Sequence, residues 1–187
     1  MTSAGLEFDV DAVDVDEQRL ADEPPDLYVD RLARLKASAG AARHPARPVI
    51  GADTAVVLDS DVLGKPVDDA DATRMLRRLS GRSHDVLTAV AIAWKGRVTC
   101  EVTRTRVWMV DLPEADIAAY VATGEPADKA GSYAIQGQAA RFISHIDGSF
   151  TNVVGLPVET LLQLLARAGV EVASPAHGTY PERVRPR

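Results

Sequence analysis

The order of apolar and polar residues predicts helices that alternate with strands. Apolar residues at helical spacing predict helices over 26–39, 69–79 and 157–168, and a shorter helix from Pro113 to about Gly124. β-Branched and apolar runs predict strands over 49–58, 84–94, 97–110 and 141–146. The run 84–94 is apolar on both faces, so we expect it at the centre of the sheet, with a tight Lys95-Gly96 turn after it. The pattern is that of an α/β protein.

The predicted first and last helices should each bury one apolar row. These rows are Tyr28, Leu32, Leu35 and Ala39 in the first helix, and Val158, Leu161, Leu162 and Leu165 in the last. A chain of 187 residues that is 46% hydrophobic suits a single domain with a sizeable core. Apolar periodicity ends near Ser174, so we expect a domain over 1–173 and a disordered tail over 174–187.

Composition and charge narrow the class of protein. No apolar stretch approaches the ~20 residues that a membrane helix needs, and one cysteine, Cys100, excludes an internal disulfide and fits the cytoplasm. The first 26 residues hold nine acids against Arg19, whereas the rest of the chain is nearly neutral, so we expect no nucleic-acid binding. The chain has 17 arginines and only four lysines, which makes each lysine worth examining.

A few charged residues stand where charge is costly or where loops expose it. Asp53 interrupts a buried strand, Lys65 lies in an L-G-K-P turn, and Arg82 and Lys129 lie in loops rich in small residues. Taken alone, Asp53 is equally well explained as a turn or capping aspartate, and Glu17 as part of a solvated acidic run. Taken together, these residues would supply carboxylates for Mg²⁺ and cations for a polyphosphate around one sheet.

Longer motifs then identify a family. They are V-D-E at 15–17, Y-V-x-R-L-A-x-x-K at 28–36, I-G-A-D-T at 50–54, L-G-K-P at 63–66, L-S-G-R-S-H-D-V-L-T at 79–88, Y-V-A-T-G-E-P-A-D-K-A-G-S-Y-A-I-Q-G at 120–137 and G-S-F-T-N-V-V-G-L-P at 148–157. In this order and spacing, the chain resembles the Maf family of nucleoside triphosphate pyrophosphatases from residue 5 to about residue 170. The resemblance implies a single α/β domain with a mixed, twisted β-sheet flanked by helices, as in Maf and inosine-triphosphatase-like proteins.

The resemblance also implies roles for individual residues. Asp53 matches the proton acceptor that activates the attacking water, and Glu17 matches an acidic site residue that would bind a divalent metal, Mg²⁺ or Mn²⁺, with Asp53. Lys36, Lys65 and Lys129 match phosphate-holding lysines, and we add Arg82 to this group. The implied reaction converts a nucleoside triphosphate to its monophosphate and pyrophosphate.

The base is predicted from two further positions. Thr54 and Gln136 resemble the branch of the family that acts on dTTP and UTP, whereas a branch acting on 7-methyl-GTP carries other residues there. A neutral amide can both donate and accept, as the O4 and N3–H edge of uracil or thymine requires. The sequence therefore favours a pyrimidine substrate.

The front of the chain departs from the family pattern. The family normally begins with a strand carrying S-x-S-P-R-R and a helix, and Met1 to Phe8 match only the end of that helix. We expect a start codon assigned too late rather than a true truncation, because the downstream motifs are intact.

Other functions stay open on the sequence alone. A nucleotide-binding regulator of cell division without turnover, or a pyrophosphatase for modified purine nucleotides, would share these motifs. The family further implies a homodimer.

Overall fold

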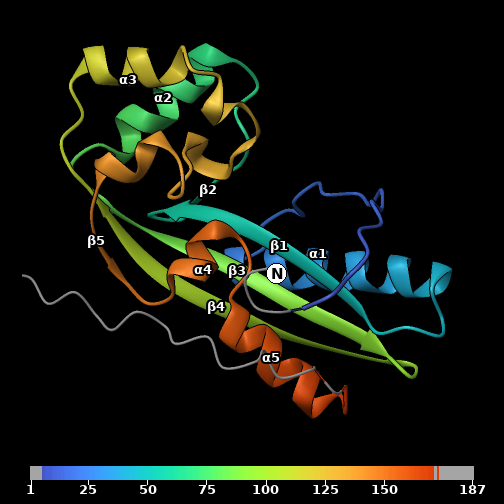
Figure 1. Ribbon diagram of the computed structural model, residues 1–187. Helices are drawn as coiled ribbons and strands as arrows, with labels where there is room; N and C mark the ends of the chain where they lie inside the picture. The colour runs from blue at the N-terminus through green and yellow to red at the C-terminus, as the bar shows by residue number, and fades with distance from the viewer. Residues whose placement is uncertain (1–5, 171, 173–187) are drawn as a thin grey trace, which may run out of the picture.

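The computed structural model describes residues 6–170 and residue 172. At its centre is a five-stranded sheet with the strand order β2-β1-β3-β4-β5 (Figure 1). The strands are β1 (Val49–Leu58), β2 (Asp61–Leu63), β3 (Ser83–Trp94), β4 (Arg97–Met109) and β5 (Ile143–Asp147). β3 is the central strand, as predicted, and the Lys95-Gly96 turn that leads to β4 has positive φ at both residues, the type I′ hairpin geometry.

The sheet was expected to be mixed, but every strand pairing in the described residues is antiparallel. The reason lies in the connections. The chain leaves β1 at Leu58, forms β2 in a hairpin, and returns at Ser83 to pair with the same end of β1; it likewise leaves β4 at Met109 and returns at Ile143. Because each connection begins and ends at one end of the sheet, the neighbouring strands must run in opposite directions. The α/β class and the single domain are confirmed.

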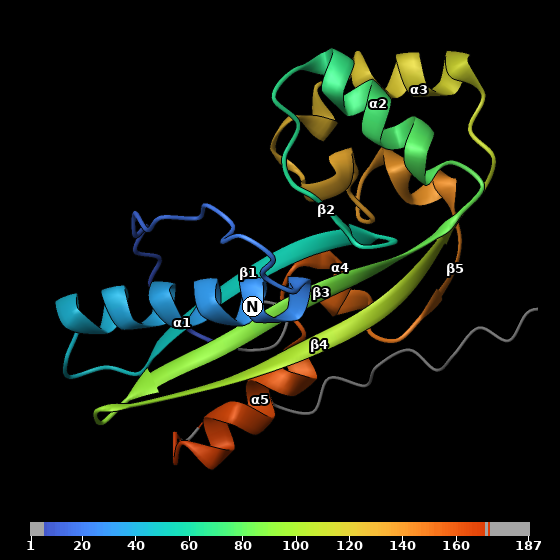
Figure 2. The same cartoon turned by 180° about the vertical axis from the view of Figure 1, so that it is seen from behind.

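Helices cover both faces of the sheet and one of its ends. The helix α1 (Pro25–Arg43) lies on one face, and α4 (Phe150–Val154) and α5 (Val158–Arg167) lie on the other (Figures 1 and 2). The two long connections form a lobe at the end of the sheet. Its elements are α2 (Asp69–Leu79), α3 (Glu114–Val121) and the 3₁₀ helices η2 (Glu125–Asp128), η3 (Ala130–Ser132) and η4 (Gln138–Phe142).

The buried row of α1 matches the predicted one only in part. Leu32 is buried as predicted, but Leu35 is 41% exposed, and the other buried residues are Val29, Ala33, Ala37 and Gly40. Small residues let α1 approach β1 so closely that a Cβ at Gly51 would lie 2.4 Å from both the Ala33 oxygen and the Ala37 nitrogen. Because Ala33 and Ala37 contact Gly51, Lys36 between them also lies beside β1 and reaches Asp53.

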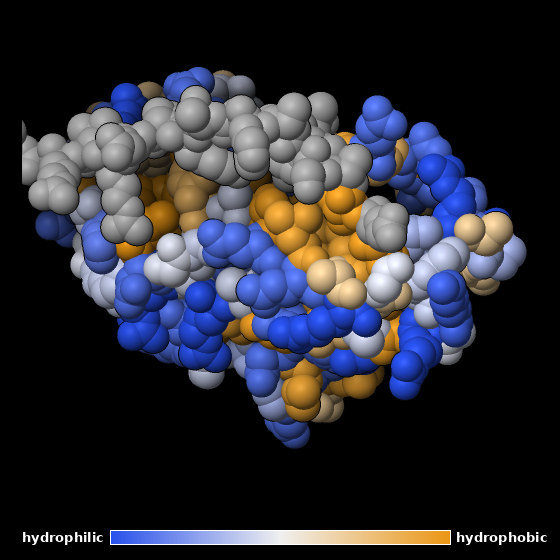
Figure 3. Space-filling model, turned by 60° about the horizontal axis from the view of Figure 1, so that its bottom comes forward, coloured by the Kyte–Doolittle hydropathy of each residue, from blue (hydrophilic) through white to orange (hydrophobic). Residues whose placement is uncertain are grey.

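The last helix shows a second difference. Leu161 and Leu165 of α5 are buried against β3 as predicted. Leu162 is exposed, and Leu164 is buried in its place. Hydrophobic patches lie among hydrophilic residues on the face shown in Figure 3. The predicted tail over 174–187 lies outside the described residues.

Among the described helices, none has the length and apolar character to cross a membrane.

Candidate active site

Asp53 lies within β1, opposite Ala89 of β3 in the ladder. Its side chain points to the α1 face of the sheet and is only 11% exposed. Burial raises the pKa of Asp53 above its ordinary value of 3.8, although the hydrogen bond and charge of Lys36 oppose this shift. A carboxylate with a raised pKa is a stronger base than a free aspartate, as proton transfer from water requires.

Lys36 joins Asp53 to Glu17. Its Nζ donates to Asp53 Oδ1 at 2.7 Å and lies 2.7 Å from Glu17 Oε1. Burial works against the charge of Lys36, but the hydrogen bonds with the two carboxylates outweigh it, so the pKa of Lys36 is raised. The lysine therefore stays charged and holds two carboxylates together that come from separate segments of the chain.

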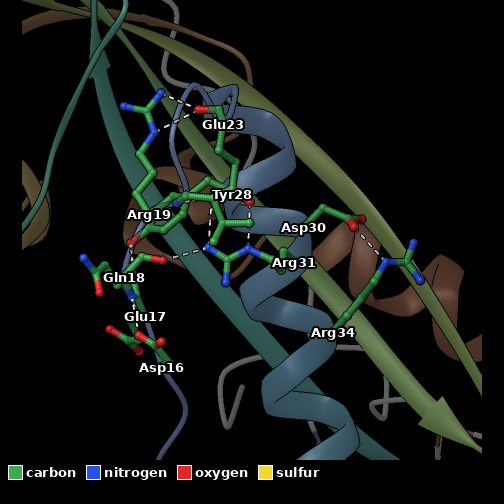
Figure 4. Close-up of polar contacts among 10 residues, drawn as sticks. Asp16, Glu17, Gln18, Arg19, Glu23, Tyr28, Asp30, Arg31 and Arg34 are labelled. Atoms are coloured by element: carbon green, nitrogen blue, oxygen red, sulfur yellow. Dashed lines mark hydrogen bonds and ion pairs between the residues drawn. The ribbon is translucent and has the colours of Figure 1, made fainter.

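The segment that carries Glu17 is fastened to α1 by groups that the sequence did not single out. Glu23 accepts two hydrogen bonds from Arg31, from Nε at 2.7 Å and from Nη2 at 2.9 Å (Figure 4). Arg31 Nη2 also donates to the Gln18 oxygen at 3.1 Å, and the Tyr28 hydroxyl donates to the Glu17 oxygen at 3.1 Å. The hydrogen bonds with Arg31 lower the pKa of Glu23 to about 2, so this carboxylate is ionised at neutral pH.

A sequence signal for this arrangement was present. Tyr28 and Arg31 lie one helical turn apart in the Y-V-x-R motif, and residues at that spacing share one side of a helix. Glu23, however, stands in an acidic run in which each carboxylate is expected to be solvated. Only the fold shows that it is 9% exposed and paired.

Two more predicted lysines, Lys65 and Lys129, lie in loops that are hydrogen-bonded to each other. Lys65 follows β2, whose Leu63 pairs with Val56 of β1, and its charge acts to lower the pKa of Asp53. The next loop is tied to the same turn, since the Gly131 nitrogen donates to the Gly64 oxygen at 3.0 Å. Lys129, just before Gly131, bonds its neighbour Asp128 at 3.0 Å. The fold thus brings the loops of Lys65 and Lys129 together.

The two predicted specificity residues, Thr54 and Gln136, lie in different parts of the structure. Thr54 points to the face of the sheet opposite Asp53, as consecutive strand residues do, and its hydroxyl lies 3.0 Å from that of Thr88. Gln136 is exposed in the segment between η3 and η4. The structure therefore does not bring the Thr54 side chain to the Asp53 cluster.

Arg82 is also separate from the cluster. Its Nη2 donates to both carboxylate oxygens of Asp59, at 2.8 and 3.0 Å. Asp53 pairs with Ala89, seven residues further along β3, which corresponds to roughly 20 Å of strand. The geometry gives Arg82 no part in the cluster around Lys36.

The donor set at Asp53 and Glu17 suits a magnesium-like ion. Mg²⁺ is usually held by one or two carboxylates together with substrate phosphates and water, rather than by a full cage of side chains. Two carboxylates that share one lysine nitrogen meet this requirement. In the part of the chain that the structure describes, no group of three or more His, Cys, Asp or Glu side chains forms a complete site.

Comparison with known proteins agrees with these motifs. The model of the Maf family, described as Maf-like protein, matches residues 1–168. The dTTP/UTP pyrophosphatase of Geobacter sulfurreducens is 51% identical over 171 residues, which cover 90% of this chain and 90% of that protein. The protein of the same name from Shewanella denitrificans is 52% identical over 168 residues, covering 88% and 85%. A third, from Koribacter versatilis, is 46% identical over 170 residues, covering 91% and 88%. By the match to the family model and by its identity to these relatives, this chain belongs to the Maf family.

Proposed function

We propose that this protein hydrolyses dTTP and UTP to the monophosphate and pyrophosphate. The observation that carries the proposal is the Asp53–Lys36–Glu17 cluster, in which one partly buried lysine holds two carboxylates. The names and the identity of the relatives, about half over most of the chain, support the same activity.

Asp53 acts as the base in this proposal. Its carboxylate accepts a proton from water while the water oxygen bonds to the α-phosphorus and the bond to the bridging oxygen of pyrophosphate breaks. The raised pKa of Asp53 favours proton acceptance, and Lys36 keeps the carboxylate ionised and oriented. Positioned bases of this kind contribute on the order of 10²–10⁴-fold in rate.

Lysines in the two joined loops take up the negative charge of the substrate in this proposal. We assign Lys65 and Lys129 to the phosphates, and we leave Arg82 out because it precedes β3 by one residue and so lies roughly 20 Å of strand from the level of Asp53. Glu17 and Asp53 would hold Mg²⁺ or Mn²⁺. Such an ion, when bound, neutralises charge on the phosphate oxygens.

Gln136 is proposed to read the base. Its amide can donate to O4 and accept from N3–H of uracil or thymine. Thr54 stays a predicted specificity residue, and its hydroxyl is engaged with Thr88 in this structure. The cytoplasm and the homodimer likewise stay predictions, the second of which light scattering would test.

A nucleotide panel tests the proposal. Wild type, Asp53→Asn and the control Asp147→Asn, an exposed carboxylate at the end of β5, are incubated with each nucleoside triphosphate and Mg²⁺ or Mn²⁺. We expect pyrophosphate release from dTTP and UTP, a loss of about 10²-fold or more in Asp53→Asn, and no loss in Asp147→Asn.

Other outcomes would redirect the proposal. Release of inorganic phosphate instead of pyrophosphate, or full activity in Asp53→Asn, contradicts the mechanism. Nucleotide binding without hydrolysis would favour a regulatory role, and preference for a modified purine would change the substrate.

A further inference from the structure

The segment around Gln136 is held by two side chains from the neighbouring helix and turn. Tyr120, at the end of α3, is 1% exposed, and its hydroxyl donates to Glu125 Oε1 at 2.9 Å. The same hydroxyl accepts from the Ala134 nitrogen at 3.2 Å, and Glu125 Oε2 accepts from the Gln138 nitrogen at 3.1 Å. The two side chains therefore bind the backbone two residues before and two residues after Gln136.

Gly137 shows how closely this contact is made. A Cβ at this position would lie 2.1 Å from Glu125 Oε1 and 2.4 Å from its carboxyl carbon, which no side chain could tolerate without displacing the carboxylate. Gly137 has ordinary negative φ, so glycine is needed here for the close approach and not for the turn. Gly137 of the I-Q-G motif is therefore in direct contact with Glu125 of the T-G-E-P motif.

Two more bonds fix the beginning of the same segment. The Tyr133 hydroxyl lies 2.7 Å from His84 Nε2 of β3, with both residues buried, and Gly131 bonds the turn that leads to Lys65. Ile135 is buried beside Gln136. Gln136 therefore projects as an exposed side chain from a backbone held on both sides.

From this arrangement we propose that Glu125 and Tyr120 are positioning residues that set the base selectivity by holding Gln136. The proposal rests on the proposed function, since it assigns the base contact to the Gln136 amide. An amide distinguishes uracil from cytosine only if its donor and acceptor stay in place, because cytosine presents the reversed pattern at the same two positions. A backbone free to shift lets the amide reorient and accept either base, and displacements of about 1 Å are enough to change rates about 10²-fold.

The test compares Glu125→Gln with Glu114→Gln. Glu114 is an exposed carboxylate on α3 that binds Arg77 at 2.6 Å, and so it is a matched control on the same lobe. In Glu125→Gln the new amide keeps the shape but cannot accept hydrogen bonds at both of its terminal atoms, so one of the two contacts is lost. Tyr120→Phe is the second variant; it removes the acceptor for Ala134 and leaves the buried ring in place.

For each variant, kcat and KM are measured with UTP and CTP, and Kd is measured with non-hydrolysable analogues of both. We expect the preference for UTP over CTP to fall about tenfold or more in Glu125→Gln and in Tyr120→Phe, mainly through KM and Kd. Glu114→Gln should keep the wild-type preference. The dependence of kcat on pH should not change in any variant, because the Asp53 cluster is untouched.

Other results would contradict the positioning role, the proposed function, or both. An unchanged UTP preference in either active variant, or an equal loss of kcat for both nucleotides, would overturn the positioning role and leave these residues as structural supports. If the wild type binds UTP selectively but hydrolyses nothing, the proposed function fails while Kd still tests the positioning role. A wild type that neither binds nor prefers UTP would overturn both.

Discussion

Replacing Lys36 by methionine should leave two carboxylates facing one another without their shared cation. Lys36 Nζ lies 2.7 Å from both Asp53 Oδ1 and Glu17 Oε1. Methionine has similar length and can fill the same space, so the change removes charge and hydrogen bonds more than packing. We therefore expect Lys36→Met to lower both activity and the free energy of unfolding.

The size of the effect follows from the exposure of each partner. Breaking a buried ion pair by removing one partner costs about 3–5 kcal/mol, whereas an exposed pair contributes about 0–1 kcal/mol. The side chains of Lys36 and Asp53 are 21% and 11% exposed, which places this pair near the buried limit, and Glu17 at 52% adds little. Lys36→Met should therefore destabilise the protein by about 2–3 kcal/mol.

A second substitution, Asp53→Asn, tests whether the unpaired carboxylate causes the loss of stability in Lys36→Met. In the Lys36→Met background, Asp53→Asn removes the buried charge that has lost its partner, so it should restore about 1 kcal/mol or more of stability. In the wild-type background the same substitution removes a hydrogen-bonded partner of Lys36 and should not stabilise to that extent. The double-mutant cycle measures this difference directly.

The pH dependence gives an independent check. In Lys36→Met the pKa of Asp53 should rise further, because burial remains while the cation that opposes it is gone. A carboxyl whose pKa is higher in the folded chain stabilises the fold below its unfolded pKa, and this stability is lost as pH rises through the folded pKa. Relative to wild type, Lys36→Met should gain stability as pH falls through the raised pKa of Asp53 toward the ordinary value of 3.8, and Asp53→Asn should abolish the gain.

Urea unfolding of the four proteins of the cycle at several pH values provides the measurement, with Lys95→Met as the control. Lys95 is an exposed lysine of the β3–β4 turn, so its loss should change stability by less than about 0.5 kcal/mol. The reasoning is refuted if Asp53→Asn destabilises Lys36→Met further, or if the pH profile of Lys36→Met parallels that of the wild type.

Three further predictions concern packing and the phosphate site. Gly51→Ala should destabilise by about 1–3 kcal/mol, seen as a lower Tm, because its Cβ would lie 2.4 Å from backbone atoms of α1; an unchanged Tm would mean that α1 can move away. Leu161→Ala should cost about 2–5 kcal/mol in urea unfolding, since the side chain is fully buried between α5 and β3, and a loss below 1 kcal/mol would contradict the observed core. Arg82→Ala should change kcat/KM for UTP by less than about threefold, since Arg82 binds Asp59; a much larger loss would return it to the phosphate site.

The sequence alone determined most of the secondary structure. β1 begins at Val49 and ends at Leu58 as predicted, because a β-branched run is bounded by Pro48 and by a polar turn. The hairpin at Lys95 was equally clear, since a Lys-Gly pair between two apolar runs favours a tight turn. These features depend on neighbours in the chain, and local patterns carry that information.

The sequence predicted only in part which residues of α1 and α5 face the core. Leu35 and Leu162 fit the apolar spacing of their helices but are exposed, and Ala37 and Leu164 are buried in their place. Spacing defines an apolar side of a helix only to within about one residue. Which edge of that side is buried depends on the partner surface, here the glycine of β1 for α1.

The candidate active site was likewise predicted only in part from the sequence. Residue types and motif order marked Asp53, Glu17 and the lysines as candidates, but only the tertiary structure shows Lys36 between the two carboxylates, because that contact depends on α1 lying against Gly51. Likewise, only the fold separates Arg82 from the cluster and places Glu125 against Gly137. Such contacts join residues far apart in the sequence, and their distances depend on how elements pack, which no local pattern contains.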